Sequence, residues 1–350
     1  MLTRTFDFKK PPKTDFFFKL IDKNGILQHS RLSRPELDFG YSLDDNARAL
    51  LVAAWFYSLF GKKKFKNLVL KFLGFLERQQ TADGRFRNYL FISLGERFLS
   101  HELAEDAFGE TIWALGLTLY LSPDDQSSQW ALRIFERSLP KISEFDGLRT
   151  KAYCLIGLTF YLQFKKDRQI EALAESLSED LVRAFEKNRS YDWNWFEDSL
   201  TYANAVLPWS LLRAAAILNQ DQYLKVALPA FEFLFEVSTI RNLPSPVGQA
   251  GWYQRLKERA IFDQQPIEAG YLVAAAADSF GLTRKKKYLN LAKFWFSWFW
   301  GNNLLGLPLI DKKDGGCYDG LRPSGVNLNK GAESTLCYLL AYLSLAQYGK

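Results

Sequence analysis

Residues 195–204 read WFEDSLTYAN, and they place aromatic rings and the carboxylates of Glu197 and Asp198 in front of an uncharged run, Ser199 to Leu212. Five other segments repeat this order, a polar cluster followed by a run of helix length with almost no charge. They begin at Asp44, Glu105, Arg149, Asp263 and Glu333. A helix that is apolar on every side is buried on every side. The pattern therefore predicts six buried helices, each with polar groups at its amino end.

A second, amphipathic segment follows each of the first five buried runs. In residues 64–78, for example, Lys and Glu alternate with Phe, Leu and Val at helical spacing. The six starts are 44 to 70 residues apart, which is the span of one helical hairpin and a loop. Closed on itself, such a repeat is an all-α (α/α)6 toroid. The buried runs are 44–60, 105–121, 152–164, 199–212, 270–277 and 334–347, and the amphipathic segments are 64–78, 129–142, 167–187, 223–237 and 285–300.

We predict one toroid domain over residues 1–350, with residues 1–43 forming an N-terminal arm and loop. Residues 86–92 and 307–311 have the composition of short strands, but turn residues flank them. We assign both to loops between hairpins.

Composition excludes several classes of protein. A hydrophobic fraction of 48% is ample for a large core. The 45 basic and 39 acidic residues are interspersed, which argues against a nucleic-acid partner. Cys154, Cys317 and Cys337 lack metal-type spacing and are interpreted as buried free thiols. Because no secretory signal and no bilayer-spanning run is present, we expect a cytoplasmic protein without a membrane segment.

In a toroid with parallel inner helices, all six amino ends meet at one end of the barrel. The polar clusters would then line a single pocket. Capping is the simpler explanation for any one of them, since Asp44, Asp198 and Ser199 are favoured N-cap residues. Capping does not require two adjacent acids, yet such pairs occur at 44–45, 105–106 and 197–198. One member of each pair is free for another role.

The residues around these pairs suggest a sugar site. Arg48 lies one turn inside a helix suited to burial, so it needs a carboxylate partner such as Asp45. Trp193 and Trp195 would stack on sugar faces, although core packing explains them equally well. Acid and base are expected among Asp45, Asp106, Glu197 and Asp263. The residues expected to bind substrate are His29, Tyr41, Arg48, His101, Trp193, Trp195, Gln264, Gln265, Asn327, Asn329 and Glu333.

Other catalytic motifs are absent from the sequence. It contains no phosphate-binding glycine loop, no HExxH and no Gly-x-Ser-x-Gly elbow. We therefore expect no cofactor and no metal, while a Ca²⁺ ion held by the clustered carboxylates remains an alternative.

Five ordered motifs carry a family resemblance. They are GYSLDDNARALL (40–51), EDAFGETIWALG (105–116), WFEDSLTYANAVLP (195–208), FDQQPIEAG (262–270) and YDGLRPSGVNLNKGAEST (318–335). Together they resemble a family of helical-toroid domains found alone or appended to group 1 glycosyltransferases, and more distantly the six-hairpin glycosidase superfamily. The resemblance implies carbohydrate metabolism, an oligosaccharide or sugar substrate and a glycosyltransferase as a partner.

The chain departs from this family at its central motif. The family pattern reads LTYDNARLPEAL, whereas this chain has Ala203, Val206 and Trp209 at the acidic, basic and acidic positions. We predict that apolar packing replaces a salt-bridged cluster there.

Three functional hypotheses follow from the sequence. The first is a glycoside hydrolase with two carboxylates as general acid and base, with inversion favoured because opposed helices suit a separation of roughly 6.5–9.5 Å. The second is a sugar epimerase or isomerase that uses His29 and His101. The third is a non-catalytic glycan-binding or scaffold domain that serves a glycosyltransferase.

Overall fold

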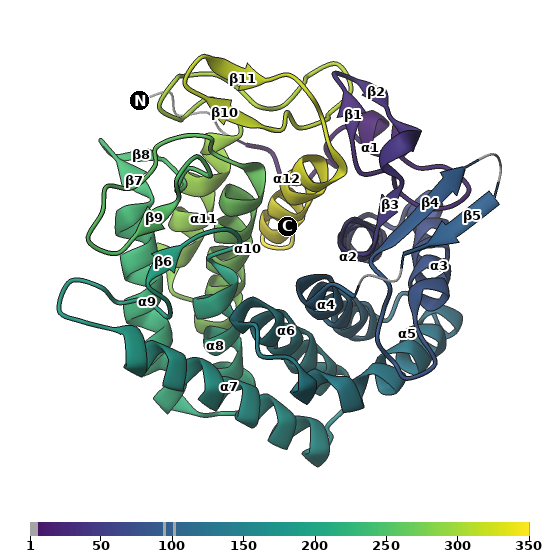
Figure 1. The fold of residues 1–350 in the computed structure, drawn as a ribbon, viewed down its shortest axis with the longest axis horizontal. Coiled ribbons are helices and arrows are strands. Elements are labelled where there is room, and N and C mark those ends of the chain that lie inside the picture. Colours follow the sequence, from purple (N-terminus) through teal and green to yellow (C-terminus); the bar gives the residue numbers. More distant parts are fainter. Residues whose placement is uncertain (1–5, 94–95, 101–102, 350) are drawn as a thin grey trace.

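The computed structural model describes residues 6–93, 96–100 and 103–349. Six of its helices form an inner ring, in which each helix packs against the next and the last packs against the first (Figure 1). These are α2 (Leu43–Phe60), α4 (Glu105–Leu121), α6 (Leu148–Phe164), α8 (Val206–Ile217), α10 (Pro266–Thr283) and α12 (Ala332–Ala346). They are buried over most of their length, as their uncharged sequences predict.

Five long helices cover the outside of this ring. They are α3 (Lys63–Gln79), α5 (Asp125–Ser138), α7 (Arg168–Asn188), α9 (Leu224–Val237) and α11 (Lys286–Trp298). The short helix α1 (Asp15–Lys19) packs on α12, where a sixth outer helix would otherwise lie. The predicted (α/α)6 toroid is confirmed.

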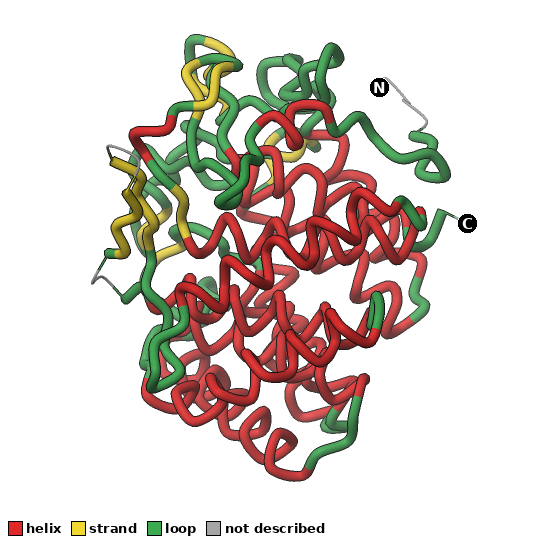
Figure 2. Tube along the Cα trace, turned by 90° about the vertical axis from the view of Figure 1, so that its right-hand side faces the viewer, coloured by secondary structure: helices red, strands yellow, loops and turns green. Residues whose placement is uncertain are grey.

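The loops contain short helices and strands. The 3₁₀ helices are η1 (Leu37–Phe39), η2 (Leu139–Glu144) and η3 (Asp221–Tyr223). The antiparallel pairs are β1 (Ser30–Arg31) with β2 (Arg34–Pro35), β6 (Ser199–Leu200) with β9 (Tyr253–Gln254), β7 (Thr239–Ile240) with β8 (Leu243–Pro244), and β10 (Gly320–Arg322) with β11 (Gly325–Asn327). A three-stranded sheet joins β3 (Tyr41–Ser42), β4 (Tyr89–Ser93) and β5 (Glu96–Leu99). In Figure 2 the strands lie toward the left of the toroid and the C-terminus lies toward the right.

The boundaries of some inner helices differ from the predicted ones. Helix α8 begins at Val206 rather than at Ser199, because Ser199 and Leu200 pair with β9 before the chain turns into the helix. Helix α10 extends beyond the uncharged run 270–277 at both ends, and Pro266 occupies its first turn, a position that suits proline. Helix α2 begins where expected, with the Ser42 hydroxyl accepting a hydrogen bond from the Asp45 amide.

The expected strands and cysteines also have clear positions. Strand β4 overlaps residues 86–92 and lies between two hairpins, whereas residues 307–311 contribute only isolated bridges, to Trp300 and Cys317. All three cysteines are buried and free, as predicted. None of the helices that the structure describes combines the length and the apolar character needed to cross a bilayer.

Helices α4 and α6 come into the closest contact of the inner ring, and glycines allow it. A Cβ atom on Gly116 would overlap the carbonyl oxygen of Gly157, and one on Gly157 would overlap the carbonyl oxygen of Ile112. Neither backbone can give way without moving a whole helix. Gly74 of α3 differs, because a Cβ atom there would only touch the Trp130 ring at 3.4 Å.

We therefore predict opposite effects for two Gly→Ala substitutions. Gly157→Ala should lower the free energy of unfolding by about 2–3 kcal/mol or more, because it forces α4 and α6 apart. Gly74→Ala should leave it unchanged or raise it by up to about 1 kcal/mol through helix propensity. Urea unfolding followed by circular dichroism measures both, and equal effects would contradict the close approach of the two inner helices.

Candidate functional site

Polar contacts connect the amino ends of neighbouring inner helices around the whole ring. Going round from α2, the contacts are Arg48 to Glu110, Thr150 to Asp106, Arg149 to Glu197, Asn204 to Glu268, Arg322 to Asp263 and Glu333 back to Arg48. Since each contact joins the start of one hairpin to the next, the six starts lie at one end of the toroid. The predicted convergence of Asp44, Glu105, Arg149, Glu197, Asp263 and Glu333 at one end is confirmed. That all six line a single pocket stays a prediction, because Glu105, Arg149 and Glu197 are not in the lining of the cavity described next.

One part of this end is hollowed into a cavity of about 270 Å³, which we call the acidic cavity. It lies between the amino ends of α2, α10 and α12 and the loops that precede them. Its lining consists of Gln28, His29, Asp44, Asp45, Gln249, Asp263, Gln265, Asp319, Gly320, Arg322, Asn327, Gly331, Glu333 and Ser334. Five of these residues are acids, and Arg322 is the only arginine or lysine among them.

Arg48 is buried behind the acidic cavity and contacts three of the acids that line it. Its guanidinium group is 2% exposed and lies 3.2 Å from Asp45, 3.4 Å from Asp44 and 3.4 Å from Glu333. On its inner side it contacts Glu110 at 2.6 Å. The predicted pairing of Arg48 with Asp45 is confirmed, and one cation serves four carboxylates.

Burial, together with the excess of acids over cations, raises the pKa of several carboxyl groups at this end of the toroid. Burial raises the pKa of Asp45 well above its ordinary value, and Asp44 and Glu333 add to the effect while Arg48 opposes it. Burial likewise raises the pKa of Glu110 well above the usual range. A raised pKa is what a carboxylic acid needs to donate a proton near neutral pH.

The wall formed by α12 and its preceding loop carries two further acids. Burial raises the pKa of Asp319, and the Gly331 amide, which donates a hydrogen bond to that carboxylate at 2.5 Å, works in the opposite direction. Burial also raises the pKa of Glu333, whose side chain retains 40% exposure on the cavity side.

The neighbouring part of the lining is formed by the residues before α10, which pair with the loop before α12. Asp263 is 35% exposed, and its carboxylate lies 3.5 Å from the Arg322 guanidinium. The Gln265 amide donates a hydrogen bond to Gln249 at 2.8 Å. His29 reaches the cavity from the N-terminal loop and packs edge-on against Phe39.

The structure therefore brings Asp45 and Asp263 together with His29, Gln265, Asn327 and Glu333. It places Asp106 and Glu197 at the other half of the ring. There Asp106 accepts a hydrogen bond from Thr150 at 2.7 Å, and Glu197 accepts two from Arg149 at 2.9 and 3.1 Å. Neither residue lines the acidic cavity.

Several residues predicted to bind substrate are instead packed into the protein. Trp193 and Trp195 are 2% and 0% exposed and contact the Phe233 ring, so core packing accounts for both. Tyr41 is fully buried and donates a hydrogen bond to Asp22 at 2.7 Å.

Two predicted amides also have structural partners. Gln264 is fully buried and bonds to Ser245 and Trp298. Asn329 accepts a hydrogen bond from the Leu32 amide at 2.9 Å. His101 lies outside the described residues.

Several residues of the site were not singled out from the sequence, among them Glu110, Asp319, Gln249 and Arg322. Glu110 and Asp319 have raised pKa values, and Asp319 and Gln249 line the acidic cavity. The only sequence signal for Glu110 is that it is the last charge in an otherwise uncharged run, five residues after Glu105. The role of Glu110 depends on its contact with Arg48, which belongs to another helix.

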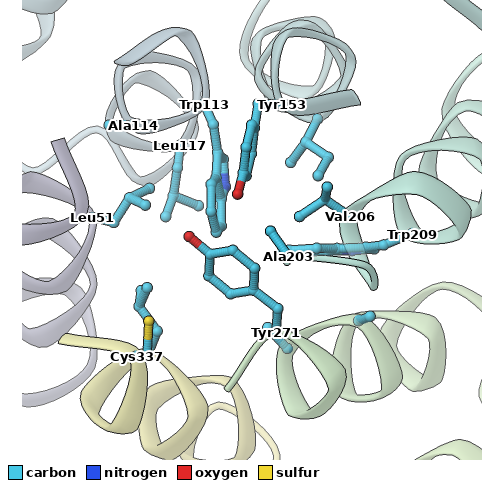
Figure 3. Close-up of a cluster of buried hydrophobic side chains, with 14 of the residues drawn as sticks. Leu51, Trp113, Ala114, Leu117, Tyr153, Ala203, Val206, Trp209, Tyr271 and Cys337 are labelled. Carbon is cyan, nitrogen blue, oxygen red and sulfur yellow. The ribbon is translucent and has the colours of Figure 1, made fainter. Parts of the chain in front are cut away.

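The substituted central motif packs in the middle of the toroid. Ala203 and Val206 are fully buried and Trp209 is 2% exposed, and Figure 3 shows them around the same axis as Trp113 and Tyr271. The predicted apolar packing is confirmed.

Glu268 of α10 holds the backbone beside this motif. Its carboxylate accepts hydrogen bonds from the backbone amides of Ala203 and Asn204 and from the Asn204 side chain at 3.0 Å. It thereby caps the start of α8 from the neighbouring hairpin.

Among the residues described, no group of three or more His, Cys, Asp or Glu side chains is arranged to hold a metal ion. The acids of the acidic cavity are instead shared among Arg48, Arg322 and backbone or side-chain donors.

Comparison with solved structures defines the class of fold. Cellobiose 2-epimerase from Spirochaeta thermophila matches with a TM-score of 0.72 at 13% identity, covering 96% of this chain and 94% of that one. D-mannose isomerase matches at 0.70 and 13%, covering 93% and 94%. An α-1,6-mannanase from Salegentibacter matches at 0.66 and 12%, covering 97% of both chains. The chain therefore shares the (α/α)6 toroid fold of these proteins.

The comparisons show no relationship more specific than this fold. No protein-family model and no curated protein matches the sequence. At the identities above, the structural likeness establishes the fold alone.

The first prediction from the site concerns Arg48. Arg48→Met should lower the free energy of unfolding by about 3–5 kcal/mol, because it leaves Glu110 and Asp45 buried without their cation. Arg183→Met on the outer helix α7 is the control, since Arg183 is 66% exposed and should change stability by less than about 0.5 kcal/mol. Urea denaturation of both variants provides the measurement. An unchanged stability for Arg48→Met would show that the carboxylates do not depend on it.

The second prediction concerns pH. Burial raises the pKa of Glu268 from 4.5 to about 7, against the opposing effect of its N–H donors. The folded state then binds a proton that the unfolded state releases above pH 4.5. The contribution of Glu268 to the free energy of unfolding is complete below pH 4.5. It is lost as the pH rises to about 7, by roughly 3 kcal/mol in all.

Glu268→Gln removes this titrating group, so the variant should lose less stability than the wild type between pH 5 and pH 8. Parallel urea unfolding at the two pH values measures the difference, and the comparison is independent of the variant's absolute stability. Equal pH dependence in the two proteins would show that Glu268 does not titrate in this range.

Proposed function

We propose that the protein is a carbohydrate-active enzyme of the glycoside hydrolase type whose active site is the acidic cavity. The observation that carries the proposal is that Asp45, a buried acid with a raised pKa, and Asp263, a partly exposed carboxylate from another hairpin, line the same cavity. A hydrolase needs one carboxyl group that gives a proton to the leaving oxygen and a second that activates water.

In this proposal Asp45 is the general acid. Burial and the neighbouring acids Asp44 and Glu333 keep its proton in place, and Arg48 fixes its orientation. Asp263 is the general base and takes a proton from water, while Arg322 steadies its carboxylate. Because the two acids belong to different hairpins and line the same cavity, we infer an inverting reaction, which leaves room for that water.

The remaining polar groups of the cavity suit a sugar. Gln265, Gln249 and Asn327 offer amide donors and acceptors for hydroxyl groups, and Glu333 and Asp319 offer acceptors. The comparisons agree with an oligosaccharide or sugar as substrate, since the similar structures include a mannanase and two enzymes acting on sugars by epimerisation or isomerisation. A mannanase variant in which two adjacent aspartates are replaced by asparagine is described as inactive, and Asp44–Asp45 is such a pair here.

An epimerase is the second candidate. Similar structures include sugar epimerases, and His29 lines the acidic cavity. Such a reaction removes a proton next to a carbonyl group and returns it to the other face, for which a histidine is suited. Association with a glycosyltransferase is a further proposal, and it rests on the resemblance of the sequence motifs.

One assay separates these functions. Manno-oligosaccharides and cello-oligosaccharides are incubated with the protein in D₂O and followed by NMR. Hydrolysis releases new reducing ends, whereas epimerisation changes the configuration at C2 and introduces deuterium there. Binding of a glycan without either change would select the non-catalytic glycan-binding domain.

On a substrate that is turned over, Asp45→Asn and Asp263→Asn should each lower kcat by about a hundredfold or more, since each removes a proton-transfer group. Asp146→Asn is the matched control, because that side chain is fully exposed to solvent. Asp106→Asn and Glu197→Gln test the other half of the ring. Loss of turnover in those two, with Asp45→Asn and Asp263→Asn active, would move the active site away from the acidic cavity.

A further inference from the structure

A second cavity lies at the opposite end of the toroid, at the carboxyl ends of the inner helices. We call it the aromatic cavity; its volume is about 300 Å³. Its lining consists of Trp55, Trp113, Leu117, Tyr120, Leu121, Phe160, Gln163, Trp209, Arg213, Asp278, Gly281, Leu282, Arg284, Gln347 and Tyr348. Six of these residues carry aromatic rings. An inner helix of 17 residues is about 25 Å long, so this cavity is distant from the acidic one.

The wall of the aromatic cavity contains an ion pair. Arg213 is 1% exposed, and its Nη1 donates to Asp278 Oδ2 at 2.7 Å. The Trp209 indole donates to the same oxygen at 2.7 Å. Asp278 is 18% exposed, so the pair consists of one buried charge and one that opens on the cavity. Burying the Arg213 charge costs free energy that a packed apolar side chain would not cost.

Both members of the pair keep hydrogen-bonding capacity. A guanidinium group has five N–H donors, and Arg213 uses three of them, toward Thr159, Gln163 and Asp278. Asp278 Oδ1 accepts no hydrogen bond from any residue that the structure describes. These unused positions belong to side chains that line the cavity, and Asp278 is 18% exposed there, so both are available to a bound molecule.

We propose that the aromatic cavity is a second carbohydrate-binding site, which takes one neutral hexose-sized sugar unit. The free oxygen of Asp278 accepts a hydrogen bond from one hydroxyl, and the remaining N–H groups of Arg213 donate to its neighbour. Tyr120 is 43% exposed and Tyr348 is partly exposed, so these two rings provide surfaces for the C–H faces of the sugar, whereas Trp209 and Phe160 are buried in the packed lining.

Charge favours a neutral ligand. Arg213 and Asp278 neutralise each other, and among the described residues of the lining Arg284 is the one further arginine, at an exposed position. An anionic sugar would have to compete with Asp278 for Arg213, and a cationic one would face Arg284. This site is independent of the proposed hydrolase activity, since none of its residues lines the acidic cavity.

Intrinsic tryptophan fluorescence tests the proposal, because Trp55, Trp113 and Trp209 all line the aromatic cavity. The full chain is titrated with D-glucose, D-mannose, D-galactose and cellobiose. At least one of these sugars should change the emission saturably. The same titration in Asp45→Asn should give an unchanged Kd, which assigns the signal to the aromatic cavity rather than to the acidic one.

Two variants locate the binding. Asp278→Asn should raise Kd roughly tenfold or more, through the loss of a charged acceptor. Tyr120→Ala should raise it roughly fivefold, through the loss of a ring face. Because Tyr120 is 43% exposed, this variant should fold normally even if Asp278→Asn does not. Tyr191→Ala, on a fully exposed tyrosine, is the matched control and should leave Kd unchanged.

Several outcomes would overturn the proposal. One is that no sugar of the panel changes the fluorescence. Another is that Tyr120→Ala binds as tightly as Tyr191→Ala, and a third is that binding disappears in Asp45→Asn. Saturable binding of adenosine with no response to any sugar would also overturn it, because the cavity would then recognise a flat heterocycle.

Discussion

The buried charge of Arg48 is the constraint on which the amino end of the toroid depends. A guanidinium group with 2% exposure must be neutralised, and its partners come from three inner helices: Asp44 and Asp45 on α2, Glu110 on α4 and Glu333 on α12. These contacts cross the junction where the last helix of the ring meets the first. The same interaction therefore closes the toroid and gathers carboxyl groups at one place.

That arrangement has a chemical consequence. One cation cannot fully compensate four acids, so burial and mutual repulsion raise the pKa values of Asp45, Glu110 and Glu333. The fold is compatible with both hydrolysis and epimerisation of sugars, since fold alone does not fix a reaction. Carboxyl groups from different inner helices are the main chemical feature of the acidic cavity, and the proposed hydrolase activity rests on them.

The two ends of the barrel are built differently around a filled centre. Trp113, Tyr153 and Tyr271 point toward one another at the axis of the inner ring (Figure 3). Toward the carboxyl ends of the inner helices, the aromatic cavity is lined by rings and contains one ion pair. Toward the amino ends, the lining of the acidic cavity is polar and acidic. The buried positions of Ala203, Val206 and Trp209 fit this division, since the Trp209 indole donates a hydrogen bond to Asp278 of the aromatic cavity.

The sequence by itself determined the repeat, the ring and the end at which the polar groups gather. Uncharged runs can only be buried and amphipathic runs can only lie outside, so local composition is sufficient for that conclusion. The partner of Arg48 was predictable for the same reason, because Asp45 lies one turn away. The tertiary structure alone decided that Asp45 and Asp263 share a cavity while Asp106 and Glu197 bond elsewhere, and that Trp193 and Trp195 belong to the core. It also decided the roles of Glu110, Glu268 and Asp278. These outcomes depend on which side chains from distant hairpins meet across the ring, and helix periodicity says nothing about that.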